Sequence, residues 1–472
     1  MKIRSYVENK YVSVADNLEL TKIISPIDHE VVAEFTNLTA QHVQLAYKFA
    51  KRIQKKWYHV APLTKVKIFE TFSKLLQENK NEFTKRMMRE IAKSKKDCES
   101  EVDRTCELIN QTISYYLKLL DSVSYADIEN PNKRAFFSRV PFGTVLAISP
   151  FNYPLNLAVS KILPSLIVGN TVVFKSATQG TWTGSLIVDL LYQAGLMEGA
   201  LQFITGKGSE IGNDLVANEI ISLINFTGSY QVGKRLSELN PMAKKIYELS
   251  GKDPAIVLED ADMDLAINAI IKGAFSYSGQ RCTAIKRVLV HKSRLEELTV
   301  ALKNKMKSLT VSRDVEKNPD IVPLIDEKAA VFAHQLFTDA IDKKAKVILQ
   351  GKWETNLIHP VLLANVTSEM KLYYLEQFAP ILPIISFSTN EEAIEISNDS
   401  EFGLGGAIFT HNYKNFHNIA KQLDTGRVTW NATPARGPDN FPFTGIKHSG
   451  IGIQGINDVM LESTYPKGYV LS

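Results

Sequence analysis

From about residue 140 the chain alternates between short β-rich apolar runs and amphipathic stretches, and this alternation limits the possible fold more than any other feature. We predict buried strands at residues 144–149, 171–175, 201–205, 220–226 and 244–249. The first four are each followed by a turn containing Gly, Ser or Thr and then by a helical pattern. Because strands that alternate with helices usually pair in parallel, with helices on both faces, the sequence predicts an α/β fold.

A second series of strand and helix patterns follows the first. Its predicted strands are residues 254–258, 286–291, 346–349, 381–387, 406–410 and 427–430. Before both series, residues 39–120 carry apolar side chains at helical spacing, which predicts a helical region. The charge run at residues 93–97 is interpreted as a solvated face of that region.

Two further β-rich segments lie outside these series. One is residues 135–140, and the other is the C-terminal stretch 443–472, which has the pattern of a tail of weak strands. Exposed β segments outside the main sheets indicate a subunit interface, although ordinary sheet edges have the same pattern.

Length and charge narrow the class of protein. A chain of 472 residues is too long for one core, so we expect two or three domains. Its net charge is only +4, from 55 basic and 51 acidic residues, which argues against a dedicated binder of nucleic acid or membrane surfaces. The most apolar stretch, 155–168, is interrupted by Lys161 and Pro164, so we predict no membrane span.

The chain has three cysteines, Cys98, Cys106 and Cys282. This odd, sparse set is neither a disulfide framework nor a metal knuckle, so we predict no metal site and a reducing, cytoplasmic setting. The N-terminal sequence MKIRSYVENK is polar and lacks the apolar core of a signal peptide.

Two glycine-containing segments approach nucleotide-binding loops without matching them. Gly206, Gly208 and Gly212 give the spacing G-x-G-x-x-x-G, which an ordinary tight turn explains equally well. Residues 228–234 read G-x-x-x-x-G-K, but Arg235 follows where a triphosphate loop needs Ser or Thr to hold magnesium. A triphosphatase is therefore disfavoured, whereas a dinucleotide at the start of this predicted helix fits, since free backbone N–H groups there favour phosphate.

Cys282 is the candidate nucleophile. It lies in a turn that contains Ser278 and Gly279, between a helical stretch and a strand, and Arg281 immediately precedes it. Cationic neighbours and free backbone N–H groups lower the pKa of a thiol, and the thiolate is the reactive form. A buried structural cysteine is the alternative, and it is our interpretation of Cys98 and Cys106.

Two polar residues complete a candidate reaction centre. Glu248 lies inside an apolar strand end, where a carboxyl group titrates nearer neutrality and suits general-base chemistry; a carboxylate facing water is the alternative. Asn152 lies between Pro150 and Pro154, and a rigidly held amide suits an oxyanion donor; an Asn that supports its own turn is the alternative. Together with Cys282, these residues supply a base, an oxyanion donor and a nucleophile.

Six motifs occur in one order along the chain: SPFNYP around Asn152, FKSATQ at Lys175, FTGS at Thr227, ELSGK at Glu248, SGQRC at Cys282 and E-x-F-x-P at Glu376. In this combination the sequence resembles the aldehyde dehydrogenase superfamily over nearly its whole length. The resemblance implies a Rossmann-type cofactor domain (1–118 and 138–249), an α/β catalytic domain (250–442) and a small β oligomerisation arm (119–137 and 443–472). It also implies a homotetramer.

The resemblance further implies a mechanism. The Cys282 thiolate attacks an aldehyde, the Asn152 amide and the Cys282 N–H stabilise the oxyanion, and hydride transfer leaves a thioester. Glu248 then activates water, which hydrolyses the thioester.

Cofactor contacts follow from the same motifs. The matching positions are Ser149, Lys175, Thr178, Thr227, Gly228, Ser229, Glu376 and Phe378. Many family members that prefer NAD carry Glu where this chain has Thr178. The loss of that anion, with Lys175 nearby, predicts a preference for NADP over NAD, which stays possible as a weaker cofactor.

Within the superfamily the sequence is most similar to the NADP-dependent non-phosphorylating glyceraldehyde-3-phosphate dehydrogenases, through GAFSYSGQRCTAIKRVLV at 273–290 and PARGPDNFPF at 434–443. This likeness implies irreversible oxidation of glyceraldehyde 3-phosphate to 3-phosphoglycerate. It also implies a substrate-phosphate site, formed by Arg104, Tyr153, Arg281 and Arg436.

Three residues depart from the family pattern: Ser176, Ser250 and Ala379 replace a usual Pro, Gly and Gly. A Cβ matters at the two glycine positions if the backbone there needs a positive φ or close approach to a ligand. Two alternatives stay open: oxidation of another aldehyde or semialdehyde, and a catalytically idle nucleotide-binding or structural protein.

Overall fold

Five parallel strands form the centre of an eight-stranded sheet in the computed structural model, which describes residues 1–8, 10–12, 18–121, 123–126, 129 and 132–471. The central strands, in sheet order, are β12 (Lys244–Glu248), β11 (Ile221–Thr227), β8 (Thr144–Ser149), β9 (Thr171–Ser176) and β10 (Leu201–Phe203). Antiparallel edge strands are β24 (Gly450–Ile451) on one side and β2 (Ser5–Val7) with β3 (Lys10–Val12) on the other. The five predicted strands of this series are thus present, with ends shifted by at most two residues.

Helices cover both faces of this sheet because its strands are apolar on both sides. Along β8, Val145 and Ala147 pack into one core and Leu146 into the other, as the two-residue period of a strand requires. One face carries α1 (Ala40–Tyr58), α7 (Gly208–Val216) and α8 (Tyr230–Leu239). The other carries α2 (Pro62–Glu78), α3 (Lys80–Ile91), α4 (Lys95–Leu119), α5 (Asn156–Ile167) and α6 (Thr181–Gln193).

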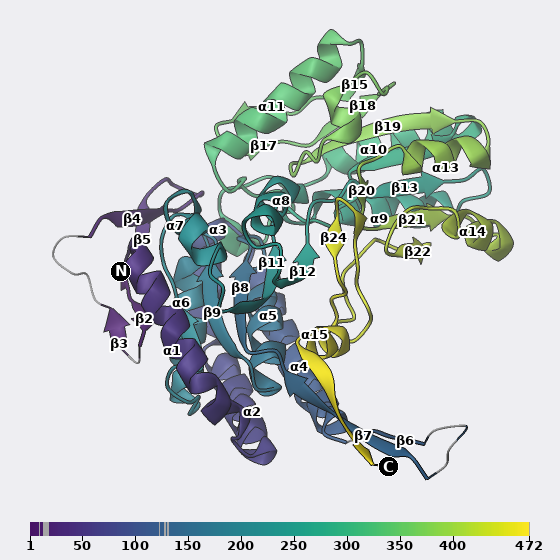
Figure 1. Ribbon diagram of the computed structural model, residues 1–472. Coiled ribbons are helices and arrows are strands. Elements are labelled where there is room, and N and C mark those ends of the chain that lie inside the picture. Colours follow the sequence, from purple (N-terminus) through teal and green to yellow (C-terminus); the bar gives the residue numbers. More distant parts are fainter. Residues whose placement is uncertain (9, 13–17, 122, 127–128, 130–131, 472) are drawn as a thin grey trace.

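A second sheet of seven strands lies above the first in Figure 1. Its order is β15 (Lys346–Leu349), β18 (Val361–Ala364), β19 (Ile381–Phe387), β14 (Arg287–His291), β13 (Pro254–Val257), β21 (Gly406–Phe409) and β22 (Val428–Trp430), and only β15 is antiparallel. Its two cores are covered by α9 (Met263–Phe275) and α10 (Leu295–Lys307) on one face and by α11 (Glu327–Asp342), α13 (Asn390–Asn398) and α14 (Tyr413–Ala420) on the other. The predicted α/β class is confirmed, although β18 was not predicted.

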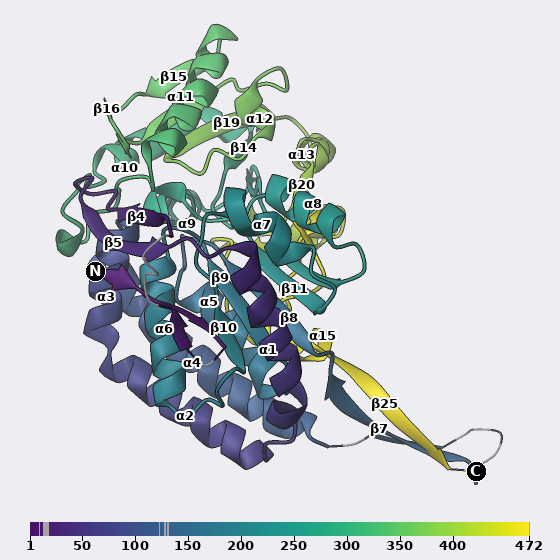
Figure 2. The same cartoon turned by 60° about the vertical axis from the view of Figure 1, so that its left-hand side comes forward.

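A three-stranded antiparallel sheet extends away from this body (Figures 1 and 2). It consists of β25 (Thr464–Leu471), β7 (Arg134–Pro141) and β6 (Val123–Ala126). Another small sheet near the N-terminus pairs β1 (Lys2–Ile3), β5 (Val31–Thr36) and β4 (Leu20–Ile24), which the sequence did not predict.

The C-terminal segment differs from its prediction. Residues 456–462 form helix α15 (Ile456–Glu462), not a weak strand, and the helix packs on α4 and α5. Ile456, Val459 and Met460 are its buried residues, at the i, i+3, i+4 spacing of a helix. Both α15 and β24 adjoin the first sheet, although the predicted arm includes them. The division into three domains stays a prediction.

In the described part of the chain, no helix combines the length and hydropathy that crossing a membrane requires.

Glu90 connects the helical region to the turn that precedes α6. Its buried carboxylate on α3 accepts hydrogen bonds from the amides of Gly180, Trp182 and Thr183, and from the Thr183 hydroxyl, at 2.7–3.0 Å. These amides belong to the helix start, where no intrahelical acceptor exists. Glu90 therefore fixes the start of α6, and with it the C-terminal end of the segment 176–180, which contains Ser176 and Thr178.

We predict that Glu90→Ala lowers the free energy of unfolding by about 3 kcal/mol or more, because it leaves several buried N–H groups without an acceptor. Glu90→Gln retains one acceptor oxygen and should lose less. Urea denaturation of both variants measures the difference; a Glu90→Ala protein as stable as the wild type would show that water replaces the carboxylate without cost.

Candidate active site

Cys282 lies in a loop between α9 and β14, directly after the 3-10 turn η1 (Ser276–Gly279). Tyr277 and Ser278 have φ of 50° and 56°, a left-handed conformation that side chains other than glycine rarely adopt. Their side chains hold them there: the Tyr277 hydroxyl donates to the Ile91 carbonyl at 2.6 Å, and the Ser278 hydroxyl bonds the backbone of Val322. The surrounding structure thus fixes the loop that carries Cys282.

The Cys282 thiol contacts Glu248 directly. Its Sγ donates to Glu248 Oε1 at 3.1 Å, and the Thr227 hydroxyl donates to Glu248 Oε2 at 3.4 Å. Glu248 ends β12 and is only 1% exposed, while Cys282 is half-buried. A thiol and a carboxylate within hydrogen-bond reach form a nucleophile and base pair, and the two residues come from different sheets.

The environment of the thiol differs from the sequence expectation. Burial raises the pKa of Cys282 well above its usual value, and the negative charge of Glu248 raises it further, whereas the ammonium of Lys286 lowers it. The expected cation was Arg281, but its guanidinium instead donates to the Pro434 carbonyl at 3.4 Å. Sequence reasoning missed Lys286, whose only signal was a lysine at the start of an apolar strand.

Asn152 is held against the nucleophile loop. It is 4% exposed, and its side-chain Nδ2 donates to the Gln280 carbonyl at 2.9 Å. Since Gln280 lies two residues before Cys282, the amide is bound to the loop that carries the candidate nucleophile.

A buried ion pair supports the Asn152 loop from behind. Lys93 and Glu101 are each 1% exposed, with Nζ and Oε2 2.5 Å apart. Lys93 donates to the Asn152 carbonyl at 3.1 Å, and Glu101 accepts from the amides of Leu155 and Asn156. The interpretation of residues 93–97 as a solvated face is therefore wrong at Lys93, because its charge has a partner in the core.

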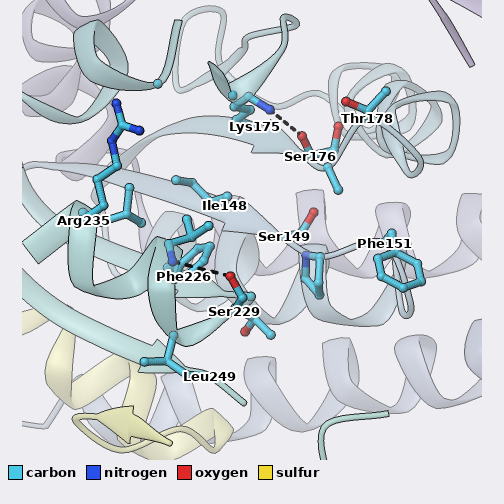
Figure 3. A pocket seen from close by; sticks show the side chains of 18 of the residues that line it. Ile148, Ser149, Phe151, Lys175, Ser176, Thr178, Phe226, Ser229, Arg235 and Leu249 are labelled. Carbon is cyan, nitrogen blue, oxygen red and sulfur yellow. Dashed lines mark hydrogen bonds between the residues drawn. The ribbon is translucent and has the colours of Figure 1, made fainter. Parts of the chain in front are cut away.

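A pocket of about 710 Å³ lies at the carboxyl ends of strands of the first sheet, and Ser149, Ser176 and Phe226 are among its lining residues (Figure 3). Cys282 and Asn152 also line it. This is the edge where parallel α/β sheets bind ligands. Every residue predicted to contact a cofactor lines it: Ser149, Lys175, Thr178, Thr227, Gly228, Ser229, Glu376 and Phe378.

The far part of the pocket has an apolar wall from α7 and α8, which includes Leu215, Val232 and Leu236. Such a wall suits a flat aromatic base. At the start of α8, Ser229 caps the helix, and Gly228 has no room for a side chain, since a Cβ there would lie 2.4 Å from the Phe226 ring. These residues fit a dinucleotide whose diphosphate lies on a helix N-terminus.

Two basic residues, Lys175 and Arg235, line the same pocket as Thr178. Lys175 points its ammonium to the Ser176 carbonyl at 3.0 Å (Figure 3), and burial lowers its pKa to about 8. Arg235, which sequence reasoning used only to reject a triphosphate loop, also lines the pocket. Among the described residues that line the pocket, Glu376 is the only carboxylate, so an added phosphate on the ribose would meet no negative charge at Lys175, Thr178 or Arg235.

Three predicted phosphate-binding arginines converge on residues 434–439. Arg104 forms a two-bond ion pair with Asp439, at 2.9 and 2.7 Å. Arg436 donates to Gln454 at 3.0 Å, its Nε lies 3.7 Å from Glu248 Oε2, and its buried Nη1 has no partner among the described residues. Arg281 reaches the same segment at Pro434.

The fourth predicted residue, Tyr153, follows Asn152 in the same loop. The Lys93 ammonium lies 3.5 Å from the centre of its ring. Burial lowers the pKa of Arg104, but its pairing with Asp439 raises the pKa by more, and an electrostatic interaction with Tyr153 adds to the rise. Tyr153 therefore lies close enough to Arg104 to share a site with it.

The departures from the family pattern leave the backbone unstrained. None of Ser176, Ser250 and Ala379 has a positive φ. Ser250 lies on the pocket wall, and its carbonyl accepts from the Ser449 hydroxyl at 2.6 Å. Among the residues that the structure describes, no group of three His, Cys, Asp or Glu side chains is placed to hold a metal ion.

Comparison with known proteins places this geometry in a family. A model described as the aldehyde dehydrogenase family matches residues 12–468. The chain is similar to the NADP-dependent glyceraldehyde-3-phosphate dehydrogenase of Streptococcus equinus, with 44% identity over 93% of this chain and 92% of that protein. The protein of the same name from Nicotiana plumbaginifolia is 40% identical, over 95% and 91% of the two chains.

A solved structure resembles the fold over the full length. It is the NADP complex of an NADP-dependent glyceraldehyde-3-phosphate dehydrogenase from Bacillus halodurans C-125, with a TM-score of 0.98 and 41% identity. The match covers 100% of this chain and 99% of that one.

Proposed function

Because this chain belongs to the aldehyde dehydrogenase family, we propose that it oxidises glyceraldehyde 3-phosphate to 3-phosphoglycerate with NADP. The observation that carries the proposal is the 3.1 Å contact between Cys282 and Glu248 at the end of a dinucleotide-sized pocket. The similar proteins named above are called NADP-dependent glyceraldehyde-3-phosphate dehydrogenases, and Arg436 beside Glu248, with Arg104 and Arg281 around residues 434–439, supplies charge for a phosphorylated substrate.

The residues divide the reaction into two steps. Glu248 accepts the Cys282 proton, and the thiolate attacks the aldehyde carbon, so that a thiohemiacetal oxyanion forms within reach of the Asn152 amide and the Cys282 N–H. A bound NADP supplies the acceptor for the hydride that leaves this carbon. The carbon is then a thioester on Cys282.

Hydrolysis uses the same carboxylate again. Glu248 first releases the Cys282 proton to solvent, and as a carboxylate it then takes a proton from a water molecule, which attacks the thioester and releases the acid and the Cys282 thiolate. Because water accepts the acyl group, no acyl phosphate forms and the overall oxidation is irreversible. An idle protein of the same fold would have no need for the contact between thiol and carboxylate.

The substrate phosphate is proposed to bind Arg104, Tyr153, Arg281 and Arg436. In support, Arg436 has a buried, unpartnered Nη1, which an anionic oxygen would satisfy. Against a general aldehyde site stands this concentration of guanidinium groups around residues 434–439. Oxidation of another aldehyde remains the second candidate, because Asp439 already neutralises Arg104.

We also propose assembly through the three-stranded sheet. Its apolar side chains are exposed at Val123, Tyr125, Tyr469 and Val470, and such an apolar surface favours burial against another copy. A homotetramer is the proposed assembly. The three free cysteines support a reducing, cytoplasmic setting.

The first test is turnover. Purified protein with NADP and glyceraldehyde 3-phosphate, in buffer without inorganic phosphate, should form NADPH continuously. The absorbance of the reduced cofactor measures this formation. Cys282→Ser should form none. Activity on other aldehydes but not on this one would keep the chemistry and reject the substrate, whereas inactivity on every aldehyde would favour an idle protein.

The phosphate site predicts a selective loss. Arg281→Leu should raise KM for glyceraldehyde 3-phosphate about tenfold or more, since a charge-assisted bond contributes ~1.5–3 kcal/mol, while activity on unphosphorylated glyceraldehyde persists. Arg294→Leu, which removes a surface arginine paired with Glu297, is the matched control. Equal losses on both aldehydes would argue against a phosphate site at Arg281.

The residue at position 178 is expected to decide the preference between NADP and NAD. Thr178→Glu should lower kcat/KM for NADP about tenfold and leave kcat/KM for NAD nearly unchanged, since the new carboxylate repels a 2′-phosphate. Thr178→Gln has the same shape without the charge and should keep the preference for NADP. Wild-type initial rates that favour NAD would contradict the assignment.

A further inference from the structure

Lys286 occupies a position that neither the family motifs nor the sequence reasoning assigns. It immediately precedes β14, four residues after Cys282, and its side chain is 1% exposed. Its ammonium donates to the carbonyls of Arg281 and Cys282 at 2.8 and 2.9 Å, and it lies 3.1 Å from Glu376 Oε1. All three ammonium protons therefore have acceptors, which fixes the direction of the group.

These contacts connect the nucleophile to the cofactor pocket. Two of the acceptors are the backbone carbonyls on either side of the Cys282 amide, the proposed oxyanion donor. The third, Glu376, lines the pocket and also accepts from the Gly251 amide at 3.1 Å. The backbone of Lys286 is itself fixed, since its N–H donates to Asp253 and its carbonyl accepts from Gln377.

The thiol needs a nearby positive charge. Glu248 and Glu376 are carboxylates that act on the thiol, and both repel the negative charge that Cys282 would carry as a thiolate. The cations around it are Lys286, Lys161 from α5, and Arg436, whose Nε lies 3.7 Å from Glu248. Burial, followed by the charge of Arg436, lowers the pKa of Lys161 to about 7, so Lys161 is only partly charged near neutral pH.

We propose that Lys286 is the positioning residue that fixes the Cys282 loop and supplies the buried positive charge that favours the thiolate. This inference deepens the proposed function and rests on Cys282 being its nucleophile. If Lys286 only held the loop in place, its charge would have no effect on the ionisation of the Cys282 thiol. An activating lysine makes the ionisation of Cys282 depend on its charge.

The experiment measures thiol ionisation without turnover. The full-length protein is alkylated with iodoacetamide across a pH series, and the Cys282 peptide is quantified by mass spectrometry, which separates it from Cys98 and Cys106. Lys286→Met should raise the apparent pKa of Cys282 by about one unit or more, so that alkylation below that pKa slows about tenfold. Lys286→Arg keeps the charge and should restore most of the rate.

Lys252→Met is the matched control. Lys252 is equally buried, and its amino group donates to the Leu375 carbonyl and to Gln377 on either side of Glu376, both at 2.7 Å. Burial, followed by the charges of Arg287 and Lys286, lowers the pKa of Lys252 well below its usual value, so the variant controls for the loss of a buried lysine side chain. It has no bond to the Cys282 loop among the described contacts. Its loss should leave the pH profile of Cys282 alkylation unchanged, and a shift equal to that of Lys286→Met would overturn the specific role of Lys286.

Lys286→Gln tests the same idea in a side chain that still donates hydrogen bonds. Its amide can bond a loop carbonyl but carries no charge, so the apparent pKa of Cys282 should rise as it does in Lys286→Met. If Lys286→Met does not fold, Lys286→Gln and Lys286→Arg decide the question. A folded Lys286→Met or Lys286→Gln protein with the wild-type pH profile overturns the proposal.

The assay also separates this inference from the proposed substrate. If the protein does not oxidise glyceraldehyde 3-phosphate but its Cys282 alkylation depends on Lys286, the role of Lys286 stands and only the proposed substrate is rejected. Conversely, turnover of glyceraldehyde 3-phosphate with an unchanged alkylation profile in Lys286→Met would keep the function and reject the role of Lys286.

Discussion

The contact between Cys282 Sγ and Glu248 Oε1 joins two halves of the molecule that fold around separate cores. Glu248 ends a strand of the first sheet, and Cys282 precedes a strand of the second. A displacement of about 1 Å between the sheets would remove the bond, because hydrogen bonds weaken steeply beyond 3.5 Å. The buried bonds that cross this boundary, including that of Asn152 to Gln280, therefore serve the chemistry as much as the fold.

The site places several charges where water is largely excluded. Burial alone disfavours a thiolate at Cys282, and so does a carboxylate in contact with it. The arrangement becomes useful only because cations alternate with the anions: Lys286 lies against Glu376, and Arg436 lies near Glu248. Under the proposed mechanism, these cations offset the repulsion that Glu248 and Glu376 exert on a Cys282 thiolate.

The sequence predicted most of the sheets because buried parallel strands are continuous apolar runs. It missed β18, a four-residue run that follows Pro360, and β24, since two residues carry no period. It also singled out Cys282, Glu248 and Asn152, which the fold brings together, because each belongs to a motif with a specific chemistry; their catalytic roles stay a prediction. The sequence did not predict the buried lysines that support the site, Lys93 and Lys286. Lysine is mostly exposed in proteins, and only the fold shows that these two have carboxylate partners in the interior.

In the proposed phosphate site, Arg436 and Arg281 have different roles, although both are guanidinium groups. Arg436 lies 3.7 Å from Glu248, so an anion that draws it away would change the field at this carboxylate, and replacing Arg436 should disturb kcat as well as substrate affinity. Arg281 bonds only the Pro434 carbonyl among its described partners, at a long 3.4 Å, and can turn to a ligand. The effect of a substitution on substrate affinity alone should therefore be clearest at Arg281. The contact of Arg436 with Glu248, by contrast, would let a phosphorylated substrate act on the proposed base that hydrolyses its own thioester.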